Sequence, residues 1–363
     1  MKILHLMAGG NVGGIEILMK DFAGFSRHEN HYMMIWGSDG ATTQLLRQRN
    51  CPVTELKTTA KTSLKQFRII ENYCREQKID LAIAHHAAPL AHLFLRHLKR
   101  KCPWLKTVAY AHGNAVNMAR ENEKRGLWLR KWVLARSLKR ADLVVAISRS
   151  VAESLTGYFG TPKEKIRVIY NGTDLSAHAQ QKPRPKERAV KLIYVGRLIE
   201  LKGVQLTLRA LAALKTDRPW CFQIVGDGPY RQELERQSRE LGIAEQVHFL
   251  GERLDVPQLL ADADLFVHMP VWEEGFGITI IEAMAAGKVC VCGDSGAISE
   301  IITHGVDGFL VPKQDVAALA GCLQAQFDQE QNWEMIGKAA KERAKAFSVE
   351  IFVRELDEAC SGL

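Results

Sequence analysis

The sequence predicts an α/β protein of two domains, each built on a parallel sheet with helices packed against it. Apolar, β-branched runs alternate with segments of helical periodicity almost from end to end. A polar, basic stretch with two prolines, residues 176–188, interrupts that alternation near the middle. With 363 residues, 47% of them hydrophobic and 25% charged, the chain is long enough for two cores. Two Rossmann-like halves joined by a hinge are the simplest arrangement.

The first half, residues 1–173, is predicted to consist of repeated strand–helix units. It begins with the strand Lys2–Met7 and a helix that follows Gly14. Further helices are expected at Leu64–Glu76 and Val151–Tyr158. The remaining expected strands are His31–Trp36, Leu81–His85, Thr107–Ala111, Leu143–Ile147 and Arg167–Tyr170. Because apolar strands alternating with helices are typical of sheets buried on both faces, we expect this sheet to be parallel.

A second alternating series makes up the other half, residues 191–346, after a linker predicted at 174–190. Its expected strands are Lys191–Val195, Cys221–Val225, Val247–Leu250, Leu265–His268 and Val289–Cys292. The pattern closes in helices, one of them at Ile278–Ala286. This repetition of the first half's pattern is the reason for predicting a second Rossmann-like domain.

Composition indicates the cellular environment of the protein but does not identify its function. The eight cysteines include no Cys-x-x-Cys pair, and Cys290 and Cys292 alternate within an apolar run, so buried reduced thiols and a cytoplasmic location are expected. No apolar run is long enough for a membrane span, and neither a span nor a signal peptide is expected. The net charge of +8 suits nucleic acid, an anionic membrane surface or a phosphorylated ligand equally.

Glycine-rich turns follow several of the predicted strands, where parallel sheets bind their ligands. After the first strand, Gly9–Gly14 would let backbone amides approach a phosphate, or would simply form a tight turn. After the first strand of the second half, Gly196 and Arg197 are followed by Lys202. An arginine fork and a lysine charge at one strand end suit a diphosphate, although solvated surface cations would give the same pattern.

The next turn, Gly226–Pro229, carries two glycines, Gly226 and Gly228, that begin a dinucleotide-binding fingerprint, but Pro229 and the missing third glycine break it. The strongest local pattern lies further on. Glu274 precedes a loop containing Phe276 and Gly277 that opens onto the helix starting at Ile278, and Glu282 follows Glu274 after seven intervening residues. Backbone amides at this helix start could bind a phosphate, and Glu282 could accept hydrogen bonds from ribose hydroxyls. Exposed helix-end carboxylates are the plainer alternative.

Histidines also end predicted strands. His112 follows Thr107–Ala111 and is succeeded by Gly113, where a polar ring could reach a bound sugar, although a lone histidine is often structural. His85 and His86 end another strand and are weaker candidates. Asp262 and Asp264 form an Asp-x-Asp triplet, but they precede an apolar strand and are interpreted as helix-end and strand-start residues, so no metal site is predicted.

Together these marks resemble the retaining GT-B glycosyltransferases of group 1, or family 4, which build bacterial polysaccharides and glycolipids. The resemblance covers nearly the whole chain. In order, its marks are Gly9–Gly14, His112, Ser148, Asn171–Asp174, Gly196–Leu198 with Lys202, Gly226–Pro229, and the pair Glu274 and Glu282. It implies two Rossmann-like domains facing a cleft, the first binding the acceptor and the second the nucleotide-sugar donor, with the last helix, 347–363, packing back on the first.

The resemblance also implies residue roles. Arg197 and Lys202 would neutralise the donor diphosphate, Glu282 would hold the ribose, and Glu274 would position the transferred sugar with His112. The other donor-binding residues implied are Gly13, Gly14, Gly196, Gly226, Gly228, Phe276, Gly277 and Ile278. The expected enzyme is a metal-independent, retaining hexosyltransferase without cofactor, using a UDP-sugar and a glycan or lipid-linked acceptor.

Three other functions stay open at this point. A nicotinamide-dependent oxidoreductase would fit the glycine turns, a sugar-nucleotide epimerase would share the architecture, and a nucleic-acid-binding protein would fit the charge; no nucleic-acid motif supports the last. A basic segment, residues 120–136, places Trp128, Trp132 and Ala135 on one helical face among lysines and arginines. It predicts either an ordinary packing helix or contact with an anionic membrane at the inner face of the cell membrane.

Overall fold

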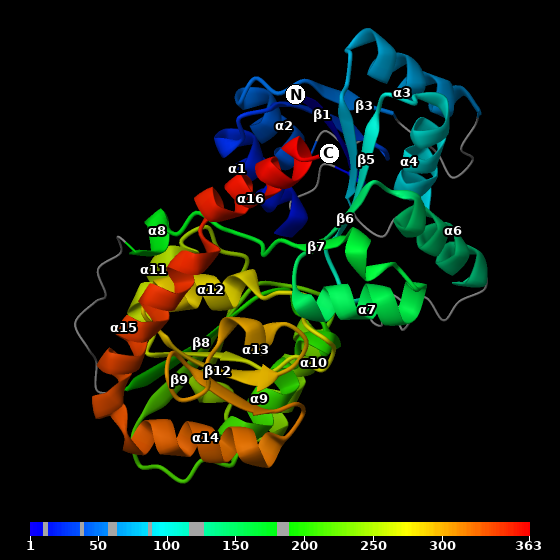
Figure 1. Cartoon of the computed structure of the whole chain (residues 1–363). Helices are drawn as coiled ribbons and strands as arrows, with labels where there is room; N and C mark the ends of the chain where they lie inside the picture. The colour runs from blue at the N-terminus through cyan, green and yellow to red at the C-terminus, as the bar shows by residue number, and fades with distance from the viewer. Residues whose placement is uncertain (10–13, 37–39, 57–63, 86–88, 116–126, 180–188) are drawn as a thin grey trace. The chain divides into compact units, whose positions relative to one another are not determined.

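The computed structural model describes residues 1–9, 14–36, 40–56, 64–85, 89–115, 127–179 and 189–363. The chain divides into two compact units, Met1–Thr173 with Val349–Leu363 (unit 1) and Asp174–Ser348 (unit 2). Each is an α/β unit with its own parallel sheet and its own buried core (Figure 1). In the described part of the chain, no helix is both long enough and apolar enough to cross a membrane.

Unit 1 contains a seven-stranded parallel sheet in the order β3-β2-β1-β4-β5-β6-β7. Its strands are β1 (Lys2–Met7), β2 (Glu29–Met34), β3 (Val53–Glu55), β4 (Leu81–His85), β5 (Lys106–Ala111), β6 (Leu143–Ala146) and β7 (Ile166–Val168). The central strands β1 and β4 are almost wholly buried, as expected of strands covered by helices on both faces. Because they are parallel, their carboxyl ends lie at one edge of the sheet, which is where His85 and His112 are placed.

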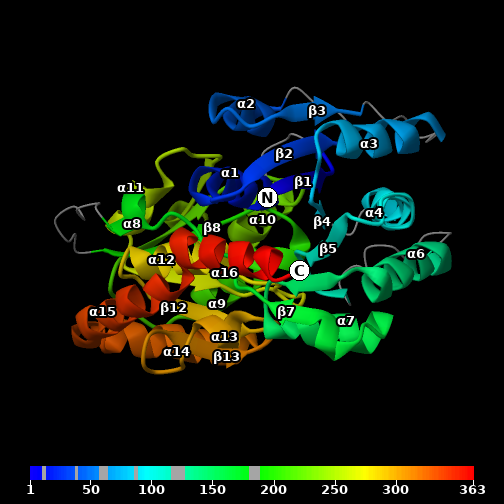
Figure 2. The same ribbon diagram turned by 45° about the horizontal axis from the view of Figure 1, so that its top comes forward.

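The helices of unit 1 follow from apolar periodicity and local caps. Those in the described residues are α1 (Gly14–Phe25), α2 (Ala41–Gln48), α3 (Leu64–Glu76), α4 (Pro89–Lys101), α6 (Leu127–Arg140), α7 (Arg149–Phe159) and α16 (Val349–Ser361). Helix α7 begins at a serine cap, since the Ser148 side chain accepts from the Val151 amide, and it ends at Gly160 in the left-handed conformation. Helices α4 and α6 lie side by side (Figure 2).

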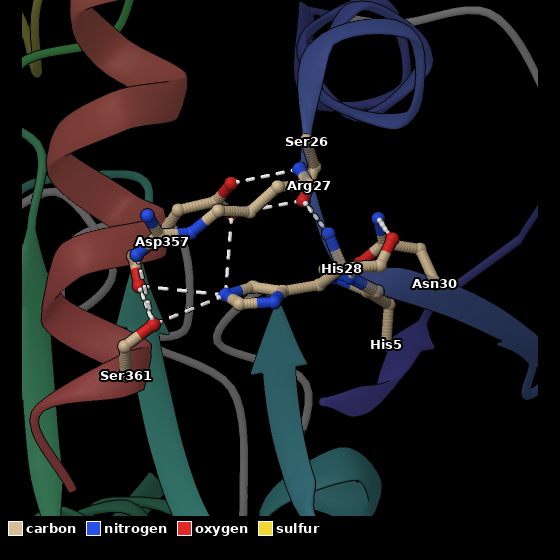
Figure 3. Close-up of polar contacts among 7 residues, drawn as sticks. All are labelled: His5, Ser26, Arg27, His28, Asn30, Asp357 and Ser361. Carbon is tan, nitrogen blue, oxygen red and sulfur yellow. Dashed lines mark hydrogen bonds and ion pairs between the residues drawn. The ribbon is translucent and has the colours of Figure 1, made fainter.

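Helix α16 belongs to unit 1 although all of unit 2 separates it in sequence from the rest of that unit. It packs against α1, with the rings of Phe22 and Phe352 6.0 Å apart (Figure 1). Asp357 fixes its position: the carboxylate accepts from the Ser26 hydroxyl at 2.8 Å and from the Arg27 amide at 3.0 Å (Figure 3). A buried, charge-assisted contact thus holds the end of the chain to the segment between α1 and β2.

Unit 2 contains a six-stranded parallel sheet in the order β10-β9-β8-β11-β12-β13. Its strands are β8 (Val190–Val195), β9 (Trp220–Val225), β10 (Val247–Gly251), β11 (Leu265–His268), β12 (Val289–Asp294) and β13 (Phe309–Pro312). Its α-helices are α8 (Ser176–Ala179), α9 (Val204–Ala212), α10 (Arg231–Glu240), α11 (Val256–Asp262), α12 (Ile278–Ala285), α13 (Ile298–Ile301), α14 (Val316–Asp328) and α15 (Trp333–Ala344). The strand order reverses beside β8, so the turns after β8 and β11 are where a ligand of such a sheet is expected.

The structure departs from the sequence-based expectations in the linker, at the sheet edges and in some strand bounds, such as those of β2, which was predicted at His31–Trp36. The first four residues of the basic stretch predicted as linker instead form α8, which contacts α11 and α12 of unit 2. The Asp174 carboxylate accepts from the Ser176 amide at 2.9 Å and so initiates this helix. The short strands β3 and β13, which lie at sheet edges and are only partly buried, were not predicted.

Candidate functional site

Two glycine turns meet at the carboxyl ends of β8 and β9. Gly196 and Gly226 have φ of +155° and +123°, and a Cβ on Gly226 would lie 2.1 Å from the Gly196 carbonyl oxygen. The Gly226 amide donates to the Gly251 carbonyl, and the Gly228 amide donates to the Asp227 carboxylate, both at 2.7 Å. These glycines therefore allow two backbones to pack closely, and the amides of Gly226 and Gly228 are engaged within the protein.

The turn after β8 positions the two predicted cations. Leu198 is fully buried and anchors the turn in the core of unit 2, while the Arg197 side chain is exposed. A single 3₁₀ turn, η2 (Glu200–Lys202), carries Lys202, and Gly203 follows it with φ of +75°. The Lys202 ammonium lies 2.7 Å from the Glu274 carboxylate and 5.2 Å from the centre of the Trp272 ring. Lys202 is thus directed toward the loop after β11.

Glu274 is a buried carboxylate with two partners. Its Oε2 atom accepts from Lys202 and lies 3.1 Å from Nε2 of His268, the last residue of β11. Burial by itself raises the pKa of Glu274, but the charge of Lys202 and the hydrogen bond from His268 outweigh it and hold that pKa well below its ordinary value. Burial lowers the pKa of His268. Because a carboxylate only accepts, neutral His268 carries its proton on Nε2.

The backbone around Glu274 is held as tightly as its side chain. The Glu274 carbonyl accepts from the Ala297 amide at 2.9 Å, and a Cβ on Gly296 would lie 2.1 Å from that carbonyl oxygen. Phe276 is buried, with its ring centre 5.7 Å from that of Phe347. Gly277 then caps α12 with φ of +112° and offers no side chain at the helix start. The Ile280 amide donates to the Gly277 carbonyl at 3.0 Å, so the amides that helix geometry directs out of the helix start are those of Ile278 and Thr279. A Cβ on Gly277 would lie 2.9 Å from the Ile280 side chain, so packing also favours glycine there.

Glu282 lies on α12, one turn beyond those amides. Its side chain is 20% exposed, and its Oε1 atom lies 3.9 Å from Nε2 of His178 on α8. Burial lowers the pKa of His178, against the raising effect of Asp174, so this contact is made by a mainly neutral ring. The contact with His178 is one of the several that a carboxylate can accept.

In unit 1 the structure describes His112, the predicted sugar-contacting residue, and the two ends of the predicted phosphate loop. His112 directly follows β5, and its Nε2 atom lies 3.0 Å from Nδ1 of His85 at the end of β4. Gly14 is the first residue of α1, with open space where a Cβ would point. Gly9, at the other end of the predicted phosphate loop, also has open space where a Cβ would point, whereas residues 10–13 of that loop, including Gly13, and His86 lie outside the described residues.

The structure brings together Lys202 and Glu274, and places Phe276, Gly277, Ile278 and Glu282 along one loop and helix. It adds His268, Trp272 and His178, which sequence reasoning missed. His268 carried a usable signal, because it ends a strand as His112 does; His178 carried none, since its segment was predicted to be linker. Asp262 ends α11, and the Asp264 carboxylate accepts from the Lys191 amide at 2.9 Å, so both have the structural positions expected of them.

Comparison with known families decides the class of the protein. Residues 12–177 match the model for glycosyltransferase family 4, and residues 176–343 match the model for glycosyl transferases group 1. The two matches overlap only at residues 176 and 177, and they follow the order of the two units. The chain belongs to the group 1 / family 4 glycosyltransferases. The oxidoreductase, epimerase and nucleic-acid-binding alternatives are therefore set aside.

Relatives and solved structures agree with this assignment. The glycosyltransferase is 29% identical over 272 residues to a glycogen synthase from Mycobacterium tuberculosis, a match over 73% of this chain and 62% of that protein's length. It is 29% identical over 228 residues to WcaL of Escherichia coli, a putative colanic acid biosynthesis glycosyltransferase, covering 60% of this chain and 56% of WcaL. The crystal structure of HepE from Anabaena in complex with UDP covers 100% of both chains at a TM-score of 0.87 and 27% identity. The fold is therefore GT-B, as predicted.

Proposed function

We propose that this glycosyltransferase moves a sugar from a UDP-sugar to a glycan or lipid-linked acceptor, with retention of anomeric configuration, in bacterial cell-surface polysaccharide or glycolipid synthesis. The donor is proposed to bind unit 2, and unit 1 to bind the acceptor. Complexes of HepE with UDP and with UDP-glucose support a uridine donor. The likeness to glycogen and colanic acid glycosyltransferases supports a saccharide acceptor.

The observation that carries the proposal is the buried Lys202–Glu274 pair beside the start of α12. Departure of a nucleoside diphosphate builds negative charge on the leaving phosphate. Lys202 and Arg197 together with the first amides of α12 would stabilise that charge. Glu274 holds the Lys202 ammonium in one place before the donor arrives, which lowers the cost of ordering this long side chain.

The proposed chemistry assigns the neutralising charge to protein cations, so no metal ion is invoked. Glu274 is proposed to position the transferred sugar rather than to attack it, because its Oε2 atom already accepts from two partners and a strongly ionised carboxylate is a weak nucleophile. Retention would then follow from departure and attack on one face of the sugar, with the leaving phosphate as base. His112 is proposed to contact that sugar from unit 1.

Calorimetric titration with UDP tests the donor assignment. The Glu282→Gln variant is expected to bind UDP about ten- to a hundredfold more weakly, because one charge-assisted contact to the ribose is lost. Glu342→Gln, on the exposed surface of α15, is the matched control and should bind like wild type. Tighter binding of GDP or ADP than UDP would contradict the uridine assignment. Affinity unchanged in Glu282→Gln would move the ribose contact elsewhere.

We also propose that helices α4 and α6 form a surface for an anionic membrane, where a lipid-linked acceptor would lie. Helix α6 packs through buried Val133, Leu134 and Leu138, so Trp128 and Trp132 face solvent, 75% and 48% exposed, and the tryptophan face is not the packing face. The guanidinium groups of Arg96 and Arg136 each lie 5.3 Å from the Trp132 ring. Tryptophans among cations are typical of helices that rest at a membrane interface.

The charges on this surface crowd one another. Burial, with the neighbouring Arg140, Arg136 and Arg100, lowers the pKa of Arg96. A hollow here is lined by Leu93, Arg96, His97, Lys99, Arg100 and Arg140. Anionic headgroups would relieve this repulsion between like charges.

Flotation with liposomes tests this surface. Wild type is expected to float with phosphatidylglycerol vesicles at low salt, less at 1 M salt, and not with phosphatidylcholine vesicles. The double variant Arg100→Glu/Arg140→Glu should lose binding. Lys338→Glu/Lys345→Glu, an equal charge reversal on exposed residues of unit 2, should keep it. Absence of wild-type flotation at low salt would refute the membrane surface while leaving the donor assignment intact.

A further inference from the structure

Four polar side chains form a continuous hydrogen-bonded row across the sheet of unit 1. We call Asn30, His5, His85 and His112 the histidine chain; they come from β2, β1, β4 and the residue after β5, which are neighbours in that order. His112 Nε2 lies 3.0 Å from His85 Nδ1, His85 Nε2 lies 2.9 Å from His5 Nδ1, and His5 Nε2 lies 3.0 Å from the Asn30 amide oxygen. The row thus connects the sheet interior with the residue proposed to contact sugar.

Burial keeps the ring of His5, which lies next to Asn30 in this chain, neutral. His5 and His85 are fully buried, and the Tyr32 ring stacks on His5 with centres 4.7 Å apart. Burial lowers the pKa of His5 to about 4, against the hydrogen bond to Asn30, which raises it. At neutral pH, His5 therefore carries one proton and has one donor and one acceptor nitrogen.

Asn30 sets which nitrogen of His5 is the donor. The Asn30 amide nitrogen donates to the His28 carbonyl at 3.0 Å, so the amide oxygen must face His5 (Figure 3). Rotating the amide by half a turn would place its oxygen against that carbonyl oxygen. The His28 segment is itself fixed, because the hydroxyl of Ser26 and the amide of Arg27 donate to Asp357. His5 therefore carries its proton on Nε2, and its Nδ1 must accept.

The same donor–acceptor argument applies to the next two rings of the chain. His5 Nδ1 accepts, so His85 donates from Nε2 and, when neutral, accepts at Nδ1; His112 then donates from Nε2. We infer that the histidine chain fixes His112 in the Nε2–H tautomer, so that its Nδ1 atom accepts a hydrogen bond from a hydroxyl group of the transferred sugar. Asn30, His5 and His85 are positioning residues that act through His112. No proton is transferred, and an amide at the far end provides no base to which one could move.

This inference rests on the proposed function for its ligand but not for its tautomer. An acceptor at Nδ1 favours a group that donates, and it disfavours a fluorine or hydrogen in the same place. Among UDP-glucose analogues with single hydroxyls replaced by fluorine, one position should therefore lose most of its kcat/KM in wild type. That loss should shrink in a variant whose chain is broken.

Nitrogen-15 NMR of the histidine side chains in the whole protein tests the tautomer without any ligand. We expect His112 to show protonated Nε2 and unprotonated Nδ1 at pH 7.5. Asn30→Leu removes the terminal acceptor, and His85→Phe breaks the chain while keeping ring volume, so either is expected to give mixed tautomers at His112. Two variants at different strands keep the test usable if one does not fold. His92→Phe is the control, because His92 is also buried but bonds to Ser137 outside the chain.

Kinetics with UDP-glucose supply the second readout. In the folded chain variants, kcat/KM is expected to fall about tenfold, which corresponds to one weakened hydrogen bond, and His92→Phe should match wild type. Wild-type His112 protonated on Nδ1 would overturn the inference whatever the activity. The expected tautomer with unchanged kcat/KM in both chain variants would overturn the role toward sugar. Absence of any UDP binding to wild type would instead refute the proposed donor.

Discussion

At the scale of single residues, the unit 2 site depends on a buried charge kept ionised by two neighbours. Glu274 is 7% exposed, yet Lys202 and His268 hold its pKa below the ordinary range despite the opposing effect of burial. Burying both charges costs desolvation free energy. Removing only one of them destabilises the fold further, because the other charge is then left buried and uncompensated. The geometry therefore ties the stability of unit 2 to the same contact that is proposed to serve catalysis.

Lys202→Met should expose this dependence. We expect unit 2 to lose about 3 kcal/mol in its free energy of unfolding, because Glu274 keeps only its contact with His268. Adding Glu274→Gln should recover part of the loss, which denaturant unfolding of both single variants and the double variant measures. Lys313→Met, which breaks the more exposed neighbouring pair with Glu273, is the control and should cost below about 1 kcal/mol. Equal costs for Lys202→Met and Lys313→Met would contradict the argument.

The sequence was sufficient to predict Lys202, Glu274 and Glu282 as candidates, because their spacing lies within one turn or one loop and helix. It was not sufficient for His268 and His178. Each approaches its glutamate only after the fold has formed: His268 reaches Glu274 through the bend after β11, and His178 reaches Glu282 through the packing of α8 on α12. Their roles toward a donor stay predictions.

At the scale of elements, the turns after β8, β9 and β11 are determined by close backbone approach. Most strands and long helices could be predicted from periodicity, and Lys2–Met7, Leu64–Glu76, Leu81–His85 and Leu265–His268 have the predicted bounds. The short helix α8 could not, because a four-residue helix is stabilised by its neighbours more than by its own sequence. The glycines were predicted as ligand-facing, whereas Gly226 and Gly228 have structural reasons to lack a side chain.

Comparison of two glycines distinguishes the contribution of backbone conformation to stability from that of close packing. Gly203 and Gly242 have nearly equal φ, +75° and +72°, but a Cβ on Gly203 would lie 1.7 Å from the Met269 carbonyl oxygen, whereas Gly242 has open space there. Gly242→Ala should cost about 1 kcal/mol from conformation alone. Gly203→Ala should cost at least about 3 kcal/mol and weaken UDP binding, since it displaces adjacent Lys202. Denaturant midpoints and calorimetry check both, and similar stability losses would show that close packing at Gly203 is relieved at little cost.

At the scale of the whole molecule, two units of similar construction differ in how the chain completes them. Unit 2 is continuous, whereas unit 1 takes its last helix from the end of the chain. The sequence predicted two parallel-sheet domains from their repeated pattern, and placed a helix at 347–363 that the structure gives as Val349–Ser361. Its partner could not be derived from the residues themselves, since Asp357 and Ser26 are 331 positions apart.

Asp357→Ala should lower the thermal unfolding temperature of unit 1 selectively. Loss of the carboxylate leaves the Ser26 hydroxyl and Arg27 amide without their acceptor, at a cost of about 2–3 kcal/mol. Glu358→Ala, at the next, exposed position of α16, is the control and should change stability by less than about 0.5 kcal/mol. Calorimetry with and without UDP identifies the transition of unit 2. A selective loss in that transition instead would contradict the placement of α16.

The position of α16 in the sequence also has a consequence for synthesis on the ribosome. The seven strands that the structure describes in unit 1 are translated before residue 174, but α1 can contact its partner helix only after residues 174–348 have been made. At ordinary translation rates that interval is on the order of ten seconds or more. During it, Phe22 lacks the ring of Phe352. A nascent chain that stops within unit 2 would therefore lack the helix that packs on α1, and Phe22 would be more accessible to chaperones and proteases.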